Sequence, residues 1–172
     1  TIRSLDQNFL EPTDLAPQQH IPGSLECITE ESVLKAVLVK LGLENQDLQQ
    51  PGITWDGCQV TKIILRNKQL RGSFSSDIKK LQKLEVLDLS NTKVRGELSS
   101  LKDATKLQEL GLGGTTVTGE LSSLKDATML QWLSLRGTKV SGELSSLKDA
   151  TKLQGIVLSS SKVSGELYSL KD

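Results

Sequence analysis

From Leu84 onward, apolar residues return to the same places every 23 residues. Each period opens with the pattern L-x-x-L-x-L and continues with three more widely spaced apolar positions. Because side chains alternate along a strand, the opening predicts a short strand, and the later positions point inward from a looping return. The four copies of this apolar set are Leu84, Leu87, Leu89, Val94, Leu98 and Leu101; Leu107, Leu110, Leu112, Val117, Leu121 and Leu124; Leu130, Leu133, Leu135, Val140, Leu144 and Leu147; and Leu153, Ile156, Leu158, Val163, Leu167 and Leu170.

The polar residues between these positions are copied as well. The run GELSSLKDAT that starts at Gly96 returns at Gly119 and Gly142 and, shortened, at Gly165. A fixed period of this length indicates a solenoid, because one repeat cannot bury its apolar residues alone. Stacked at roughly 4.8 Å per strand, the repeats share a core in which each aliphatic side chain contributes about 1.5–3 kcal/mol. We therefore predict an α/β solenoid with a parallel sheet along one side.

This pattern resembles the leucine-rich repeat, whose consensus L-x-x-L-x-L-x-x-N-x-L-x-G-x-L is met almost position by position. The resemblance covers residues 60–172 and implies a right-handed coil of about five repeats, the last incomplete, with the sheet on its concave face. The G-x-L turn resembles the plant-type repeat without its usual Ile-Pro, and Thr in place of the consensus Asn resembles repeats of unicellular algae. A looser first copy, 24 residues ahead of the next, comprises Val60, Ile63, Leu65, Leu70, Gly72, Phe74, Ile78 and Leu81.

One departure from the family pattern is systematic. The consensus Asn, whose amide bonds the backbone of adjacent turns, is replaced by Lys68, Thr92, Thr115, Thr138 and Ser161. A hydroxyl both donates and accepts, so we expect Thr to hold much of this ladder with fewer bonds than an amide.

Residues 1–25 precede any sustained periodicity and contain Pro12, Pro17 and Pro22. This composition is typical either of a flexible tail or of an extended arm that orders against a partner. The apolar residues of this segment favour the arm, because a pure spacer needs fewer of them. They are Ile2, Leu5, Phe9, Leu10 and Leu15.

Residues 26–59 are expected to form a helical cap on the first repeat. Thr29 is predicted as the N-cap of a helix of about 13 residues, with Glu30 and Glu31 in its first turn and Gly42 as its stop. The residues at helical spacing, which we expect to cover the first strand, are Val33, Leu34, Val37, Leu38 and Leu41.

The segment after this helix resembles the N-terminal cap of plant-type leucine-rich-repeat proteins. It carries Trp55, Gly57 and Cys58 ahead of Val60, but the family's usual cysteine just before the Trp is absent. Cys27 can replace that cysteine only if the fold brings it within about 6 Å of Cys58, Cα to Cα. A disulfide worth about 3–4 kcal/mol and two free buried thiols therefore both stay open.

The bulk composition excludes several classes of function. Lys and Arg number 21 and Asp and Glu number 21, and aromatic residues make up 3%. Nucleic acid binding, which needs a basic face and stacking platforms, is therefore not expected. No apolar run reaches the 18 to 20 residues of a membrane span, because Lys35 and Lys40 interrupt the longest candidate, 33–43.

Two further expectations concern the ends of the chain. A first residue Thr1 instead of Met points to a processed or truncated precursor, which suggests an organellar compartment such as the chloroplast, or an extracellular one. The sequence stops at Asp172 inside a repeat, without a polar capping repeat. We expect that the polypeptide continues or that another chain covers this end, because an open end exposes core side chains.

No constellation predicts catalysis, a metal or a cofactor. His20 is the only histidine, so no catalytic triad can be assembled, and two cysteines without a C-x-x-C pair make no zinc site. The glycines at 111, 113 and 114 lack the Lys-Ser/Thr of a phosphate loop and fall on a repeat strand. The recurring Glu97, Glu120, Glu143 and Glu166 are interpreted as a solvated charged face.

The positions that the repeat leaves free are the candidates for binding. Residues flanking the inner Leu of each strand face outward from the concave sheet, and they vary from repeat to repeat. The first column is Lys62, Val86, Glu109, Trp132 and Gly155; the second is Ile64, Asp88, Gly111, Ser134 and Val157; the third is Arg66, Ser90, Gly113, Arg136 and Ser159.

Trp132 is the sharpest candidate in these columns. Trp and Arg are favoured as interface anchors, and Arg136 lies further along the same segment. The alternative is that Trp132 packs over the neighbouring glycines and only covers the sheet.

Taken with the family resemblance, these residues predict a non-catalytic module that binds a protein partner through the concave face, within a larger assembly. Two alternatives stay open. The first is a structural accessory subunit of a large complex, such as an algal photosynthetic or other organellar one. The second is a receptor-like extracellular domain that binds a peptide or glycan, which the absence of any Asn-x-Ser/Thr acceptor disfavours.

Overall fold

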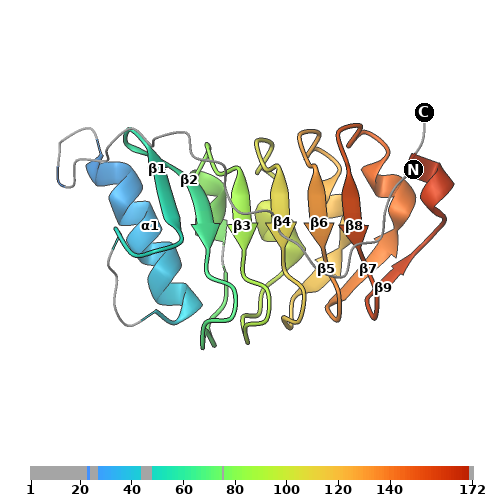
Figure 1. Cartoon of the computed structure of the whole chain (residues 1–172), viewed down its shortest axis with the longest axis horizontal. Helices are drawn as coiled ribbons and strands as arrows, with labels where there is room; N and C mark the ends of the chain where they lie inside the picture. The colour runs from blue at the N-terminus through green and yellow to red at the C-terminus, as the bar shows by residue number, and fades with distance from the viewer. Residues whose placement is uncertain (1–22, 24–26, 44–47, 75, 171–172) are drawn as a thin grey trace.

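A computed structural model describes residue 23 and residues 27–43, 48–74 and 76–170, with the side chains of 168 and 169 left out. It shows one helix followed by coils that stack side by side along the chain (Figure 1). The arm expected over 1–25 lies, apart from Gly23, outside the described residues. The helix is α1 (Ile28–Leu41), and the main sheet contains β1 (Ile53–Asp56), β2 (Gln59–Ile64), β3 (Val86–Asp88), β4 (Glu109–Gly111), β6 (Trp132–Ser134) and β8 (Gly155–Val157).

The strands of the main sheet follow the chain order, β1-β2-β3-β4-β6-β8. From β2 onward every pair is parallel, as the repeat predicts, whereas β1 pairs antiparallel with β2. The two residues of the turn between β1 and β2 are Gly57 and Cys58, and Gly57 has φ 55°, a conformation that suits glycine at the first position of a tight hairpin turn. This hairpin adds an edge strand that the repeat pattern alone does not predict.

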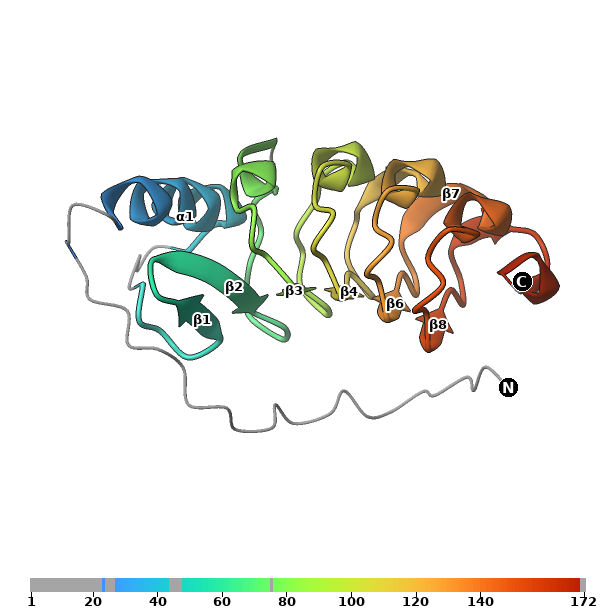
Figure 2. The same cartoon turned by 90° about the horizontal axis from the view of Figure 1, so that it is seen from above.

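The other side of the coil is built from short turns of 3-10 helix and a second, smaller sheet. Figure 2 shows the main sheet along the inner side of a shallow arc and the helical turns along its outer side. The second sheet is parallel, in the order β5-β7-β9. Its strands are β5 (Thr118–Glu120), β7 (Lys139–Glu143) and β9 (Lys162–Ser164), and the helical turns are η1 (Ser76–Lys80), η2 (Leu98–Leu101), η3 (Leu121–Leu124), η4 (Leu144–Leu147) and η5 (Leu167–Leu170).

The periodic apolar positions form one continuous core. In the three complete repeats from Leu84 to Leu147 every one of them is at most 2% exposed. The final coil is less covered, since Ile156 is 9% exposed and Leu167 is 50% exposed. The inward face predicted from the period is thus confirmed.

The buried threonines bond differently from the expected ladder. Thr92, Thr115 and Thr138 donate their hydroxyl to the carbonyl oxygen three residues earlier in their own coil, at 2.6–2.7 Å. Successive coils are instead joined by backbone bonds, such as Leu89 N–H to Gly111 O at 2.8 Å. The expectation that Thr continues the ladder between turns was wrong, because a short hydroxyl reaches only its own strand end.

Helix α1 begins earlier than predicted. The N-cap position is Cys27, without a side-chain capping bond, so the assignment of Thr29 as N-cap was wrong. Gly42 closes the helix with φ 88°, as expected. The buried residues of its inner face are Glu31, Leu34, Val37, Leu38 and Leu41.

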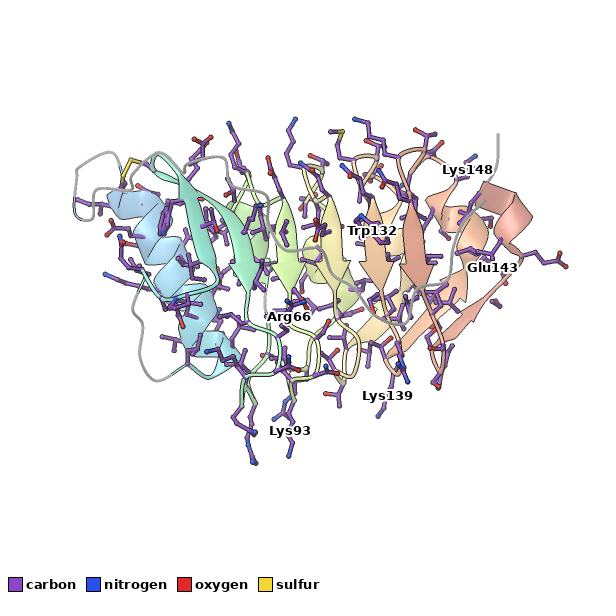
Figure 3. All side chains as sticks on the ribbon, viewed as in Figure 1. Arg66, Lys93, Trp132, Lys139, Glu143 and Lys148 are labelled. Atoms are coloured by element: carbon purple, nitrogen blue, oxygen red, sulfur yellow. A yellow bond between two sulfur atoms is a disulfide. The ribbon has the colours of Figure 1, made fainter. Side chains whose placement is uncertain are left out.

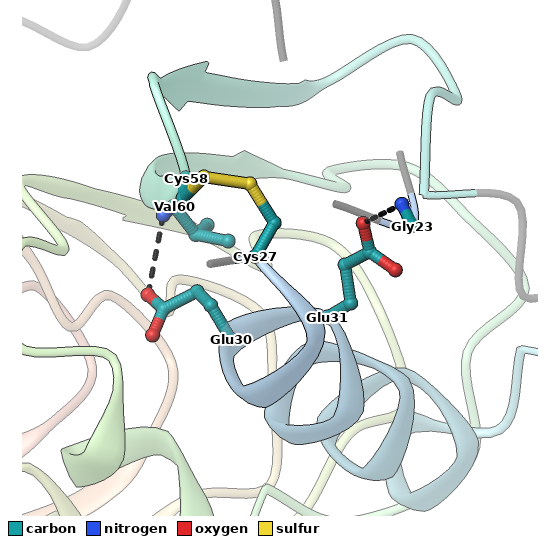
Figure 4. The surroundings of a disulfide bond; sticks show 6 residues. All are labelled: Gly23, Cys27, Glu30, Glu31, Cys58 and Val60. Atoms are coloured by element: carbon teal, nitrogen blue, oxygen red, sulfur yellow. Dashed lines mark hydrogen bonds between the residues drawn. A yellow bond between two sulfur atoms is a disulfide. The ribbon is translucent and has the colours of Figure 1, made fainter. Parts of the chain in front are cut away.

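A disulfide joins the start of α1 to the turn before β2. Cys27 and Cys58 are bonded, with their Cα atoms 4.7 Å apart, so the alternative of two free thiols was wrong (Figure 4). Beside it, Val60 N–H donates to Glu30 Oε1 at 3.2 Å and Gly23 N–H donates to Glu31 Oε1 at 2.9 Å. The pKa of Glu30 is raised, because burial outweighs the opposing effect of the hydrogen bond from the Val60 N–H.

Gly72 lets the end of α1 pack directly on the first coil, which leads to a testable prediction. Gly72 N–H donates to Leu41 O at 3.1 Å, and a side chain at 72 would overlap the carbonyl oxygen of Lys40. Gly72→Ala should therefore lower the free energy of unfolding by about 3 kcal/mol, because backbone atoms have to separate. Urea unfolding followed by circular dichroism measures this loss.

Gly137→Ala is the matched control for that substitution. Gly137 has φ 67° with no atom within 4 Å of an added Cβ, so Ala there costs only the left-handed strain, about 1 kcal/mol. Equal losses for the two variants would show that crowding against α1 is not what requires Gly72.

Candidate functional site: the concave face

The three outward columns lie across the concave face in the predicted register. Lys62, Val86, Glu109, Trp132 and Gly155 are successive cross-strand partners. The second column, from Ile64 to Val157, is aligned in the same way. The third column follows the strand ends, where backbone bonds such as Asn67 N–H to Ser90 O at 2.9 Å join neighbouring coils.

The columns differ in how far their side chains reach solvent. Arg66 and Arg136 are exposed at the end of the strands. Val86 and Asp88 are only 6% and 2% exposed, so neither presents a surface to a partner as the outward position suggested. The half-buried members of the predicted site are Lys62, Ile64, Glu109, Trp132, Ser134 and Val157.

Asp88 is a buried carboxylate in the second column. It accepts the Ser90 N–H at 2.9 Å, and Arg66 Nη1 lies 3.9 Å from its other oxygen. Gly111 makes room for it, since an added Cβ there would lie 2.5 Å from Asp88 Oδ1. Asp88 therefore shapes the strand end and anchors Arg66.

Glu109 is on the same charged part of the face as Lys62 and Asp88, and both charges act on it. Burial raises the pKa of Glu109, the positive charge of Lys62 lowers it, and the Asp88 carboxylate raises it further. The N-terminal half of the concave face is thus a mixture of both charges, and the half around Trp132 is largely uncharged apart from Arg136.

The ring of Trp132 lies against Gly155 on the next strand. A Cβ at 155 would overlap the six-membered ring, which means that the glycine provides the space for the indole. Trp132 remains half-buried on the face of the sheet (Figure 3). The packing of the ring over a neighbouring glycine is therefore observed, whereas the role of Trp132 as an interface anchor stays a prediction.

Sequence reasoning missed a row of amides beside the first column. Gln131 Nε2 donates to Gln108 Oε1 at 3.3 Å, and Gln154 Nε2 donates to Gln131 Oε1 at 3.5 Å. Their 23-residue spacing was visible in the sequence, but a spacing does not reveal which side chains bond between coils. This row stiffens the border of the concave face at the start of the strands.

Neither a metal site nor a membrane helix emerges from the described residues. Within 23, 27–43, 48–74 and 76–170, no group of three or more His, Cys, Asp and Glu is arranged to hold a metal ion. In the same part of the chain, no helix has both the length and the apolar character needed to cross a bilayer.

No protein-family model and no curated protein matches the sequence. Solved structures do match. The leucine-rich-repeat ectodomain of the Arabidopsis receptor kinase HAESA, in complex with an IDA peptide hormone, aligns with TM-score 0.70 and 22% identity over 84% of this chain and 27% of that one. The Arabidopsis BIR2 ectodomain aligns with TM-score 0.62 and 19% identity over 81% and 80%.

A bacterial structure shares the fold as well. A leucine-rich-repeat protein of Leptospira interrogans aligns with TM-score 0.55 and 23% identity over 63% of this chain and 29% of that one. Identities at this level establish the fold alone. The chain has the leucine-rich-repeat fold, and it spans about a quarter of the longer ectodomains that it matches.

Proposed function

We propose that this leucine-rich-repeat chain is a non-catalytic module that binds a protein partner on its concave face. The observation that carries the proposal is the contrast between the copied and the variable positions. From Leu84 onward the core and the outer turns repeat almost unchanged every 23 residues, whereas the outward columns vary from coil to coil. A surface that varies within a copied scaffold is where recognition of a specific partner is expected.

Trp132 and Arg136 are the proposed anchors. Large aromatic and Arg side chains dominate the binding energy of many interfaces. Trp132 is held in place by its contact with Gly155, so little rotamer freedom remains to be lost when a partner covers it. The proposed supporting contacts are Lys62, Ile64, Arg66, Glu109, Ser134 and Val157, while Val86 and Asp88 support the surface from below.

The structural neighbours support a binding role without fixing the partner. The HAESA ectodomain was solved with a peptide hormone, PEPR1 with AtPEP1, and BIR3 with SERK2. All three structures are complexes with peptides or proteins. We further propose that the coil is right-handed, as connections between parallel strands usually are, and that an N-terminal cap of the plant type precedes it. Helix α1, the β1–β2 hairpin and the disulfide support the cap.

A receptor-like extracellular domain is the second candidate function. It is favoured by the Cys27–Cys58 bond, since disulfides persist in oxidising compartments, and by the receptor ectodomains among the neighbours. An accessory subunit of a larger assembly remains the other proposal. Gentle fractionation of the native particle followed by mass spectrometry separates the two, because a fixed subunit ratio supports the assembly and a free particle supports the receptor-like domain.

Removing both anchors should weaken binding strongly with little loss of stability. We expect Trp132→Ala with Arg136→Ala to weaken the partner's affinity at least about 30-fold, which corresponds to roughly 2 kcal/mol. Loss of the contact with Gly155 should cost about 1 kcal/mol of unfolding free energy. Quantitative capture from a native extract identifies the partner, and calorimetry with that purified partner measures the affinity.

The matched control changes two exposed residues of the outer side, Lys125→Ala with Lys148→Ala. This variant should retain full affinity. If the concave variant binds as tightly as the unchanged chain, or if both variants lose affinity equally, the partner does not dock on Trp132 and the proposal fails.

A further inference from the structure

The turns that leave the parallel strands carry a concentration of positive charge. Five equivalent segments, 66–72, 90–96, 113–119, 136–142 and 159–165, contain eight Lys and Arg residues and no Asp or Glu. Figure 3 shows Lys93 and Lys139 projecting from the same border of the solenoid, opposite to the border that carries Lys148. We name this border the basic edge; its cations are Arg66, Lys68, Arg71, Lys93, Arg95, Arg136, Lys139 and Lys162.

All eight cations of the basic edge are exposed. Arg66 approaches Asp88, but no carboxylate of the described residues lies within ion-pair distance of Lys93, Lys139 or Lys162. The apolar residues of the same turns, such as Val94 and Val140, are fully buried. The edge therefore offers positive charge with almost no apolar surface.

Hydroxyl and amide groups lie between these cations. Asn91 Nδ2 donates to Asn67 Oδ1 at 3.1 Å across two coils, which aligns the amides along the edge. The third coil is neutral, and its exposed Thr116 and Thr118 separate the cations of the first two coils from those of the last two. Equivalent residues of successive coils recur at roughly 4.8 Å, so the cations of the edge stand at multiples of this spacing, with a gap at the third coil.

A row of carboxylates limits the edge on the outer side. Glu97, Glu120, Glu143 and Glu166 follow these turns and are exposed. Ser141 and Ser164 each donate a hydroxyl to the glutamate of the preceding coil, Glu120 and Glu143, at 2.7 Å. An anionic ligand is thereby confined to the line of the cations.

We propose that the basic edge binds an anionic polysaccharide, sulfated or carboxylated, laid along the stacked coils. A polymer with repeating anions can meet Lys and Arg residues that stand at multiples of one coil spacing, and its sugar hydroxyls match the Ser, Thr and Asn groups between them. A globular protein partner would need apolar anchors, which this edge lacks. Single-stranded nucleic acid would need aromatic stacking platforms, and none of the described edge residues is aromatic.

The test compares two triple variants that change the net charge equally. In the first, Lys93, Lys139 and Lys162 of the basic edge are each replaced by Glu. In the control, Lys102, Lys125 and Lys148 are replaced by Glu; these lysines recur with the same period, are exposed, and each precedes an Asp. Binding of heparin and of polygalacturonate to the full chain is measured at about 0.15 M salt and over a salt series.

We expect the unchanged chain to bind one of the two polysaccharides, the edge variant to lose affinity at least about 30-fold with a shallower salt dependence, and the control to lose less than about 3-fold. No binding by the unchanged chain, or equal losses in the two variants, overturns the proposal. Competition by duplex DNA or polyglutamate as effective as by the polysaccharide, at matched charge, overturns the assignment to a carbohydrate. Should the Glu variant not fold by circular dichroism, the same comparison is made with Gln at the six positions.

Discussion

Leu112→Ala is expected to lower the free energy of unfolding by about 3–5 kcal/mol. Leu112 is 0% exposed in the middle of the array, and its side chain packs between the coils on either side. Loss of three buried carbons combines the transfer free energy with the cavity left behind. In a solenoid this cavity weakens two coil interfaces at once, since each repeat contacts only its neighbours.

Leu158→Ala is the matched control for that substitution. Leu158 occupies the same position of the repeat in the last coil, but it is only half-buried there. It should cost about half as much as Leu112→Ala, because less apolar surface returns to water and only one neighbouring coil is described. Urea unfolding followed by the fluorescence of the tryptophans measures both losses. Equal losses would mean that the array does not unfold as stacked nearest neighbours.

The solenoid was predictable because its information is periodic. The 23-residue repeat identifies every inward position, and each of these positions from Leu84 to Leu147 is buried. The wrong predictions concern positions where local bonding, and not the repeat period, decides the structure. The start of α1 is set by the bonded Cys27 instead of a capping hydroxyl at Thr29, and Thr92 bonds within its own coil because its side chain is short.

The candidate site was predictable in register but not in accessibility. Alternation along the strands places Asp88 and Trp132 in outward columns, and the pairing confirms those columns. Whether an outward side chain is covered depends on its cross-strand neighbours. Asp88 fills the space that Gly111 leaves free, and Trp132 fills that of Gly155, which only the folded arrangement reveals.

Removal of the Cys27–Cys58 bond is expected to cost about 3–4 kcal/mol. The bond joins residues 31 apart in sequence and ties the start of α1 to the β1–β2 hairpin. Without it the unfolded chain gains conformational freedom. In addition, α1 can leave the first coil, which would expose the apolar face that Leu34 and Leu38 now share with Trp55.

The measurement compares the unchanged chain with the variant Cys27→Ser, Cys58→Ser in urea, each with and without a reducing agent. We expect the reducing agent to destabilise the unchanged chain by about the same 3–4 kcal/mol and to leave the variant unaffected. This comparison separates the bond from the loss of the buried Cys27 side chain, since reduction keeps both sulfur atoms in place. An unchanged chain with equal stability under both conditions would show that the bond contributes nothing, and α1 would then be held on the first coil by packing alone.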